Sequence, residues 1–281
     1  MTSAAGQTPP EQPPPLRPAL GASRPSRRFA SLRAIVALVL REMATTYGRS
    51  PGGYAWALIE PILGTVILTY AFTFLVARPP IGTSFELFFA TGMVPFLMWM
   101  SVTNKIGTTL MFSKPLLIYP AVTFVDAILA RFIINFLTEL MVFYIVMAGI
   151  LMLYDTRSVV DPLLLMEAIA LLAATSFAIG TANAYLFLRF NLWHQIWAII
   201  TRPMMLISCV MITFDALPLL LKDILWYNPL VHIVGLVRMG FYPSYDGYYI
   251  SPLYVCGLSL SLTAFGLLFL GAHGRRLLHE G

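Results

Sequence analysis

Residues 128–154 read ILARFIINFLTELMVFYIVMAGILMLY and are almost entirely apolar. Only Arg131 and Glu139 carry a charge in this stretch. A helix needs about 20 mostly apolar residues to cross a bilayer, and the stretch is longer than that. Because hydrocarbon offers no partner for backbone N–H and C=O groups, a crossing segment of this kind has to be helical. The stretch therefore predicts a membrane-spanning helix.

The composition of the whole chain points the same way. Of its 281 residues, 58% are hydrophobic and only 11% are charged, and the mean hydropathy is +0.78. These values lie outside the usual range of soluble domains. Five further apolar windows can be marked, at 54–77, 85–103, 163–188, 196–214 and 253–271. The sequence thus predicts an all-α polytopic membrane protein with six transmembrane helices.

Lysine and arginine are distributed unevenly around these windows. Fourteen of the eighteen lie on one side, namely Arg17, Arg24, Arg27, Arg28, Arg33, Arg41, Arg49, Lys105, Lys114, Arg131, Arg189, Arg202, Arg275 and Arg276. The positive-inside rule places that side, and both termini with it, in the cytoplasm. Topology and attraction to anionic lipid then explain the net charge of +5, which does not imply a nucleic-acid partner.

The chain divides into four expected parts. Residues 1–28 contain seven prolines and few large apolar side chains, which predicts a disordered Pro-rich cytoplasmic tail. Residues 29–50 are expected to form an interfacial amphipathic helix, and residues 51–276 the six-helix transmembrane domain. Residues 277–281 complete the chain as a cytoplasmic C-terminus.

The amphipathic segment carries an apolar stripe at helical spacing, and Ser31 is its expected N-cap. The stripe consists of Leu32, Ile35, Val36, Val39, Leu40 and Met43. A helix of this length cannot span a bilayer, so it is expected to lie along the cytoplasmic leaflet. Pro51, Gly52 and Gly53 then form a predicted hinge into the first span. A simple membrane anchor and a functional role fit these features equally well.

Polar side chains inside the predicted spans require a partner or water, since an ionised residue near the centre costs about 3 kcal/mol on insertion scales. Arg131, Asn135 and Glu139 follow an i, i+4, i+8 spacing and form one intramembrane polar stripe. Bonding between helices and lining of a transport path both account for such a stripe, and the first is favoured.

The segment between the fifth and sixth windows holds an apolar run, LVHIVGLVRMGF, that is too short to cross the membrane. Asn228-Pro229 and Pro243 bound it. We expect a short re-entrant or interfacial helix here, beside an outer vestibule.

Two stretches resemble a known family. The residues that carry the likeness in REMATTYGRSPGGYAWALIEP, residues 41–61, are Arg41, Tyr47, Arg49, Ser50, Gly53, Trp56, Glu60 and Pro61. This stretch and WYNPLVHIVGLVR, residues 226–238, are similar to segments of type-2 ABC exporter permeases, especially those that export capsular polysaccharide. The likeness extends over residues 31–276, including the order of helices and loops.

The resemblance implies a permease subunit of an ATP-driven exporter that moves lipid-linked capsular polysaccharide across the bacterial inner membrane. It implies a homodimer with two copies of a separate ABC ATPase subunit, which would bind ATP and Mg²⁺, and a periplasmic export partner. No cofactor is expected on this chain, because it contains no Gly-Lys dipeptide for a phosphate-binding P-loop and its histidines lack metal-ligand spacing. Export of O-antigen, teichoic acid or drugs stays open, as does a membrane-embedded transferase.

Two further sets of candidate residues follow from this reading. Similar permeases dock a short helix of the loop between spans two and three into the ATPase, and here that loop is NKIGTTLMFSKPLLIYP, residues 104–120. Its candidate ATPase-coupling residues are Lys105, Phe112, Lys114 and Tyr119. Sugars present hydroxyls and apolar faces, which suit a path of aromatic rings and hydrogen-bonding groups. The candidate translocation-path residues are Tyr70, Phe74, Trp226 and Tyr227, whereas an ordinary aromatic belt accounts for most other rings near that side. No catalytic or metal-binding residues are expected.

Overall fold

The structure is a computed structural model that describes residues 30–43, 53–74, 78–113 and 123–280. Within these ranges the regular secondary structure is helical throughout, which confirms the all-α fold. The helices are α1 (Ala30–Glu42), α2 (Gly53–Thr73), α3 (Phe85–Gly107), α4 (Thr109–Ser113), α5 (Phe124–Leu153), α6 (Pro162–Arg189), α7 (Trp193–Ile207), α8 (Leu219–Leu225), α9 (Pro229–Phe241) and α10 (Pro252–Glu280).

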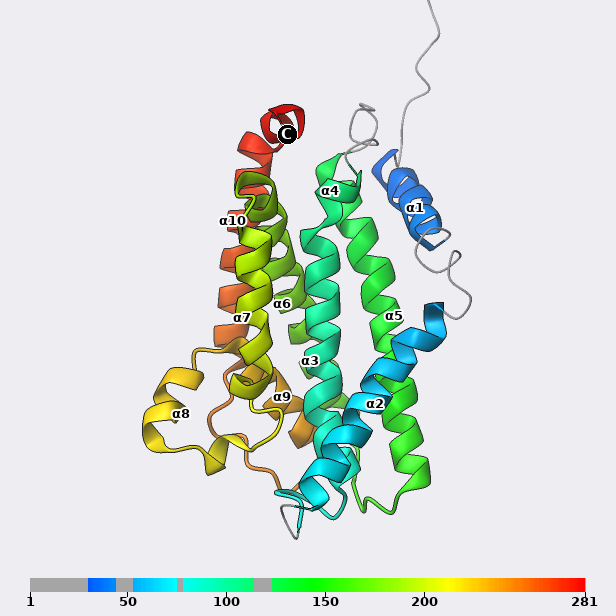
Figure 1. Cartoon of the computed structure of the whole chain (residues 1–281), viewed down its shortest axis with the longest axis vertical. Coiled ribbons are helices and arrows are strands. Elements are labelled where there is room, and N and C mark those ends of the chain that lie inside the picture. The colour runs from blue at the N-terminus through cyan, green and yellow to red at the C-terminus, as the bar shows by residue number, and fades with distance from the viewer. Residues whose placement is uncertain (1–29, 44–52, 75–77, 114–122, 281) are drawn as a thin grey trace, which may run out of the picture.

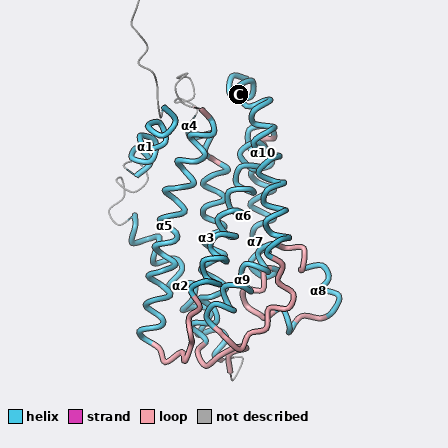
Figure 2. Tube along the Cα trace, turned by 180° about the vertical axis from the view of Figure 1, so that it is seen from behind, coloured by secondary structure: helices cyan, strands magenta, loops and turns pink. Residues whose placement is uncertain are grey.

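The long helices run side by side and form an elongated bundle with two distinct ends (Figure 1). One end carries α1, α4 and the last turns of α10, and we call it the α4 end. The opposite end carries α8, α9 and most of the connecting loops, which Figure 2 shows gathered there, and we call it the α9 end.

Counting the bent pair α8–α9 as one span gives five membrane-capable elements in the described part of the chain, and four of them are continuous helices: α3, α5, α6 and α10. These four helices coincide with four of the six predicted windows. Helices α2 and α7 occupy the places of the first and fifth windows; α2 has 21 residues, about the length that a crossing requires, whereas the 15 residues of α7 fall short of it. At about 1.5 Å per residue, α7 is roughly 22 Å long, less than the bilayer core. The count of six spans is therefore not confirmed.

Several predicted boundaries differ from the structure. Helix α3 continues past residue 103 to Gly107, so that Lys105 belongs to the helix and not to the following loop. Helix α10 continues past residue 271 to Glu280. The prediction of Ser31 as an N-cap is wrong, because α1 begins at Ala30 and the Ser31 hydroxyl instead donates to Asp126 of α5, at 2.8 Å.

The segment between α7 and α10 contains the predicted short helix. Helices α8 and α9 are bent by 102° relative to each other at Asn228, whose side chain accepts a hydrogen bond from the Leu230 N–H and caps α9. Nearly every residue of α9 is buried, and the helix packs on α3 and α6. Of the two predicted arrangements, this burial supports the re-entrant one, since an interfacial helix would keep one face against lipid or water.

Helix α6 lies at the centre of the bundle, between α3 and α10. Two glycines make the close approaches possible. A Cβ atom on Gly180 of α6 would meet the side chain of Ile106 of α3 at 2.6 Å. A Cβ atom on Gly266 of α10 would meet the backbone nitrogen of Ala182 at 2.8 Å. Small residues at such positions allow helices to pack backbone to backbone, as is common in membrane bundles.

Candidate functional site

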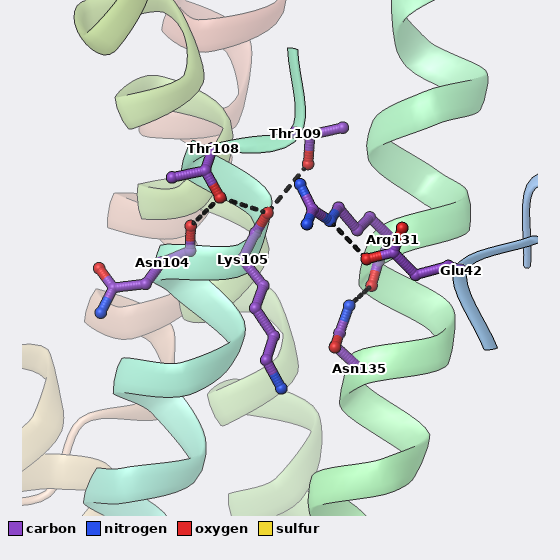
Figure 3. A network of polar contacts seen from close by, with 7 residues as sticks. All are labelled: Glu42, Asn104, Lys105, Thr108, Thr109, Arg131 and Asn135. Carbon is purple, nitrogen blue, oxygen red and sulfur yellow. Dashed lines mark hydrogen bonds and ion pairs between the residues drawn. The ribbon is translucent and has the colours of Figure 1, made fainter. Parts of the chain in front are cut away.

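The α4 end brings together four elements around a set of polar side chains (Figure 3). Helix α3 ends here, and two threonine hydroxyls bond to its last carbonyls: Thr108 donates to the carbonyl of Asn104 at 2.9 Å, and Thr109 donates to that of Lys105 at 3.1 Å. The chain then forms the single short turn of helix α4, next to α5. This order positions α4 at the edge of the bundle, between α3 and α5.

Arg131 of α5 contacts two other helices at this end. Its Nε donates to Glu42 of α1 at 2.9 Å, and its guanidinium lies 4.8 Å from the ring centre of Phe112 of α4. The side chains of Arg131 and Glu42 are only 13% and 22% exposed. An ion pair this far out of water is screened less than a surface pair, and removing one partner leaves a poorly solvated charge.

The other two members of the polar stripe bond in different directions. Glu139 accepts a hydrogen bond from Ser101 and lies 3.6 Å from the Lys105 ammonium, and both partners are on α3. Asn135 is fully buried, and its amide donates to the carbonyl of Arg131 one turn earlier, at 2.7 Å. The two ends of the stripe thus join α5 to α1 and α3, which favours the helix-bonding interpretation for these residues.

Helix α7 is attached to the same level of the bundle by two tryptophans. Trp197 donates from its indole N–H to Asn104 of α3 at 2.9 Å, and Trp193 donates to Asn183 of α6 at 3.0 Å. Asn183 is buried, and the indole N–H of Trp193 supplies the hydrogen bond that its amide oxygen needs there. Polar contacts therefore connect α1, α5, α3, α7 and α6 near one end of the molecule.

Helix α1, the predicted amphipathic segment, has one exposed apolar row and another face that packs on the bundle. Leu32, Val36, Leu40 and Met43 form a row that is between 41% and 61% exposed. A neighbouring face, with the half-buried Ile35, Val39 and Glu42, packs on α5. The helix therefore presents an apolar row to its surroundings while a separate face is fixed to the bundle.

The structure places the predicted coupling residues unequally. Phe112 is 67% exposed on α4, whereas Lys105 is directed along α3 to Glu139. Lys114 and Tyr119 lie outside the described residues, as do Pro51 and Gly52 of the predicted hinge. Gly53 is the first residue of α2.

The predicted translocation-path residues differ in their exposure. Tyr70, Phe74 and Tyr227 are 65%, 87% and 67% exposed. Trp226 is instead held within a cluster at the α9 end: its indole donates to the carbonyl of Tyr249 at 2.9 Å, and its ring contacts Tyr254. Burial raises the pKa of the neighbouring Tyr249, so its hydroxyl stays neutral and shares a hydrogen bond of 2.9 Å with Tyr245.

Arg238 of α9 is the main polar residue whose role sequence reasoning missed. It is fully buried and donates to the carbonyls of Val210 and Ile212, at 2.8 and 3.1 Å, in the turn after α7. Its guanidinium also lies 4.5 Å from the ring centre of Phe88. The available signal was a single arginine within the apolar run LVHIVGLVRMGF, where a lone charge requires buried acceptors.

The fold and this site define the class of protein: a polytopic helical membrane protein in which an amphipathic helix, α1, and a short helix, α4, both pack on α5 at one end. In the described part of the chain, no group of three histidine, cysteine or acidic side chains could hold a metal ion. The chain belongs to the ABC-2 type transporter family, whose profile matches residues 33–242. It is accordingly a transmembrane permease subunit, and ATP is used by a partner ATPase subunit.

Relatives with assigned roles match more than four-fifths of the chain. The polysialic acid transport protein KpsM of Escherichia coli is 29% identical over 233 residues, which cover 83% of this chain and 90% of that protein. The capsule polysaccharide export inner-membrane protein CtrC of Neisseria meningitidis serogroup B is 27% identical, with 84% and 89% coverage. BexB of Haemophilus influenzae, also a capsule polysaccharide export inner-membrane protein, is 25% identical with the same coverage.

Proposed function

We propose that this chain is the permease subunit of an ATP-driven exporter of lipid-linked capsular polysaccharide in a bacterial inner membrane. The observation that carries the proposal is the match to polysialic acid and capsule polysaccharide proteins over more than four-fifths of the chain. Two copies of the permease assemble with two copies of an ABC ATPase, and both termini face the cytoplasm. A periplasmic partner receives the exported glycan.

The arrangement of the α4 end supports this assignment. An exporter without its own ATPase site needs a surface that receives the motion of a partner. The α4 end offers an exposed aromatic side chain on a short helix, Phe112, beside an interfacial helix that is bonded to the bundle. In this proposal the loop after α3 docks into the ATPase, and the segment around residues 50–53 transmits movement between α1 and α2.

Co-purification and reconstitution test the proposed function. The tagged chain, extracted from its native membrane, is expected to retain an ABC ATPase. In proteoliposomes the complex should move lipid-linked capsular glycan in the presence of ATP, and an inactive ATPase variant serves as control. Transport of O-antigen, teichoic acid or a drug in place of capsular glycan would overturn the substrate assignment. Glycosyl or acyl transfer without an ATPase would overturn the permease assignment itself.

The exposed aromatic residues give a separate prediction for the glycan path. Alanine at Tyr70, Phe74 or Tyr227 should reduce export by roughly twofold to tenfold, since loss of an aromatic ring contact commonly costs about 0.5–1.5 kcal/mol. ATPase assembly and basal ATP hydrolysis should stay unchanged, because these side chains make few contacts within the chain.

Trp226 is the matched comparison for that experiment. Because its ring is packed and hydrogen-bonded, Trp226→Ala should lower the yield of folded protein in addition to export. Export and stability are measured together, by glycan transport into vesicles and by thermal unfolding in detergent. Wild-type export from the triple variant of Tyr70, Phe74 and Tyr227 would rule out the aromatic path.

A further inference from the structure

Helices α1 and α4 each pack on α5, and a single side chain of α5 contacts both of them. Arg131 reaches Glu42 of α1 through Nε and places its guanidinium plane near the ring of Phe112 on α4. A small cavity between the three helices is lined by Leu38, Arg41, Glu42, Ser113, Ala127, Ala130 and Arg131. Arg131 therefore lies at the junction of two elements that are separated by the whole length of α2 and α3 in the sequence.

The chemistry of arginine suits this double contact. Its planar guanidinium offers hydrogen bonds in its own plane and a flat face to an aromatic ring, whereas lysine offers a point charge. Here the Nε edge serves α1, and the side chain lies against Phe112 of α4. Because the Arg131 side chain is only 13% exposed, water cannot readily replace either contact.

A second polar contact fixes α1 to α5 without involving α4. The Ser31 hydroxyl donates to Asp126, which also accepts from the backbone N–H of Thr123 in the capping box of α5. This contact holds the beginning of α1, and the Glu42–Arg131 pair holds its end. Only the second of the two connects α1 to the short helix α4.

We propose that Arg131 is a positioning residue that makes α1, α4 and α5 move as one unit. The proposal rests on the function proposed above, in which α4 meets the ATPase: displacement of α4 then reaches the interfacial helix and the core of the bundle through one side chain. Loss of Arg131 leaves both the ATPase contact and the membrane helices in place. It removes the connection between them.

Spin-label distances test the mechanical part of the proposal. The exposed positions Leu40 on α1, Met111 on α4 and Leu137 on α5 are changed to cysteine in pairs, after Cys256, which is exposed, is changed to serine. In the full chain reconstituted in nanodiscs, Arg131→Gln should broaden the α1–α5 and the α4–α5 distance distributions. Arg157→Gln, which removes a pair that is about four-fifths exposed in the loop after α5, is the matched control and should change neither.

A charge exchange separates the two contacts of Arg131. Combining Glu42→Arg with Arg131→Glu restores an ion pair between α1 and α5, but it places a carboxylate near the negative face of the Phe112 ring. This variant should recover the narrow α1–α5 distribution while the α4–α5 distribution stays broad. If Arg131→Gln fails to insert, Glu42→Gln removes the α1 contact alone and should broaden only the α1–α5 distances.

Coupling of ATP hydrolysis to export tests the functional part. In the complex with its ATPase, Arg131→Gln should raise the ATP hydrolysed per glycan exported by roughly fivefold or more, the usual size of a coupling effect between two sites. ATPase association should remain as in the wild type. Unchanged distances together with an unchanged ratio would overturn the proposal. If the wild-type complex exports no glycan, the proposed function fails, while the distances still decide whether Arg131 joins the helices.

Discussion

Phe112→Asp is expected to weaken association with the ATPase by roughly thirtyfold, because a central aromatic side chain in a protein interface commonly contributes about 2 kcal/mol or more. Phe112 is an apolar ring, 67% exposed, on the short helix at the α4 end, where a docking partner would bury it. A carboxylate at this position has to be desolvated on docking, which adds to the loss of ring contact. Association is measured by co-purification and by titration of the ATPase onto the permease in nanodiscs.

Tyr248→Asp is the matched control for this prediction. Tyr248 is also an aromatic residue, 64% exposed, but it lies in the loop between α9 and α10 at the opposite end of the bundle. The control should leave ATPase association unchanged. Arg131→Gln provides a second comparison, since it removes the ring contact but keeps Phe112 itself, and it should preserve association. Equal affinity of the Phe112→Asp and wild-type permeases would remove α4 from the docking surface.

Gly266→Ala is expected to destabilise the folded chain by about 1–3 kcal/mol, the usual cost of overpacking a filled interface. The new methyl group would lie 2.8 Å from both the nitrogen of Ala182 and the carbonyl carbon of Thr181. These are backbone atoms of α6, so no side-chain rotation can relieve the contact. The helices would have to separate instead, along an interface that also contains the Thr175–Ser259 hydroxyl contact at 3.1 Å.

The same helix supplies the control. Gly257 lies earlier in α10, and a Cβ atom there would meet nothing within 4 Å. Gly257→Ala should leave stability unchanged or raise it by up to about 1 kcal/mol, because alanine has the higher helix propensity. Denaturant unfolding in detergent micelles, followed by tryptophan fluorescence, measures both variants. Equal midpoints for the two would mean that α6 and α10 are not packed as described.

Hydropathy located the long helices correctly because each of them contains its own run of apolar residues. It failed at the end of α7, where apolar residues continue through Ile212 but the helix stops at Ile207. The structure supplies the reason from elsewhere in the chain: Asn228 donates to the carbonyl of Ile207, and Arg238 donates to the carbonyls that follow. Hydrogen-bond donors that belong to another helix do not change the hydropathy of the segment whose carbonyls they bind, so a hydropathy window cannot reveal them.

The polar stripe also combines a feature that local sequence predicts with contacts that it does not predict. The spacing of Arg131, Asn135 and Glu139 predicted a shared face of one helix, and all three are on α5. Their partners could not be predicted, because Glu42 and Lys105 belong to other helices and become neighbours only through the fold. The prediction for the amphipathic segment was similarly incomplete. Its single apolar stripe included Ile35 and Val39, which are half-buried in the structure, together with the exposed row on α1.

Helix α7 is fastened near its beginning by Trp193 and Trp197, and at its end by Asn228, while Thr201 is its sole buried residue. In a helix held in this way, a few residues make the contacts that maintain the fold, and most of the other residues are exposed. Substitutions at exposed positions such as Ile199 and Arg202 disturb few internal contacts. The exposed side of α7 is thus held in place without contributing to the packing of this chain, so substitutions there should leave the fold of the chain intact.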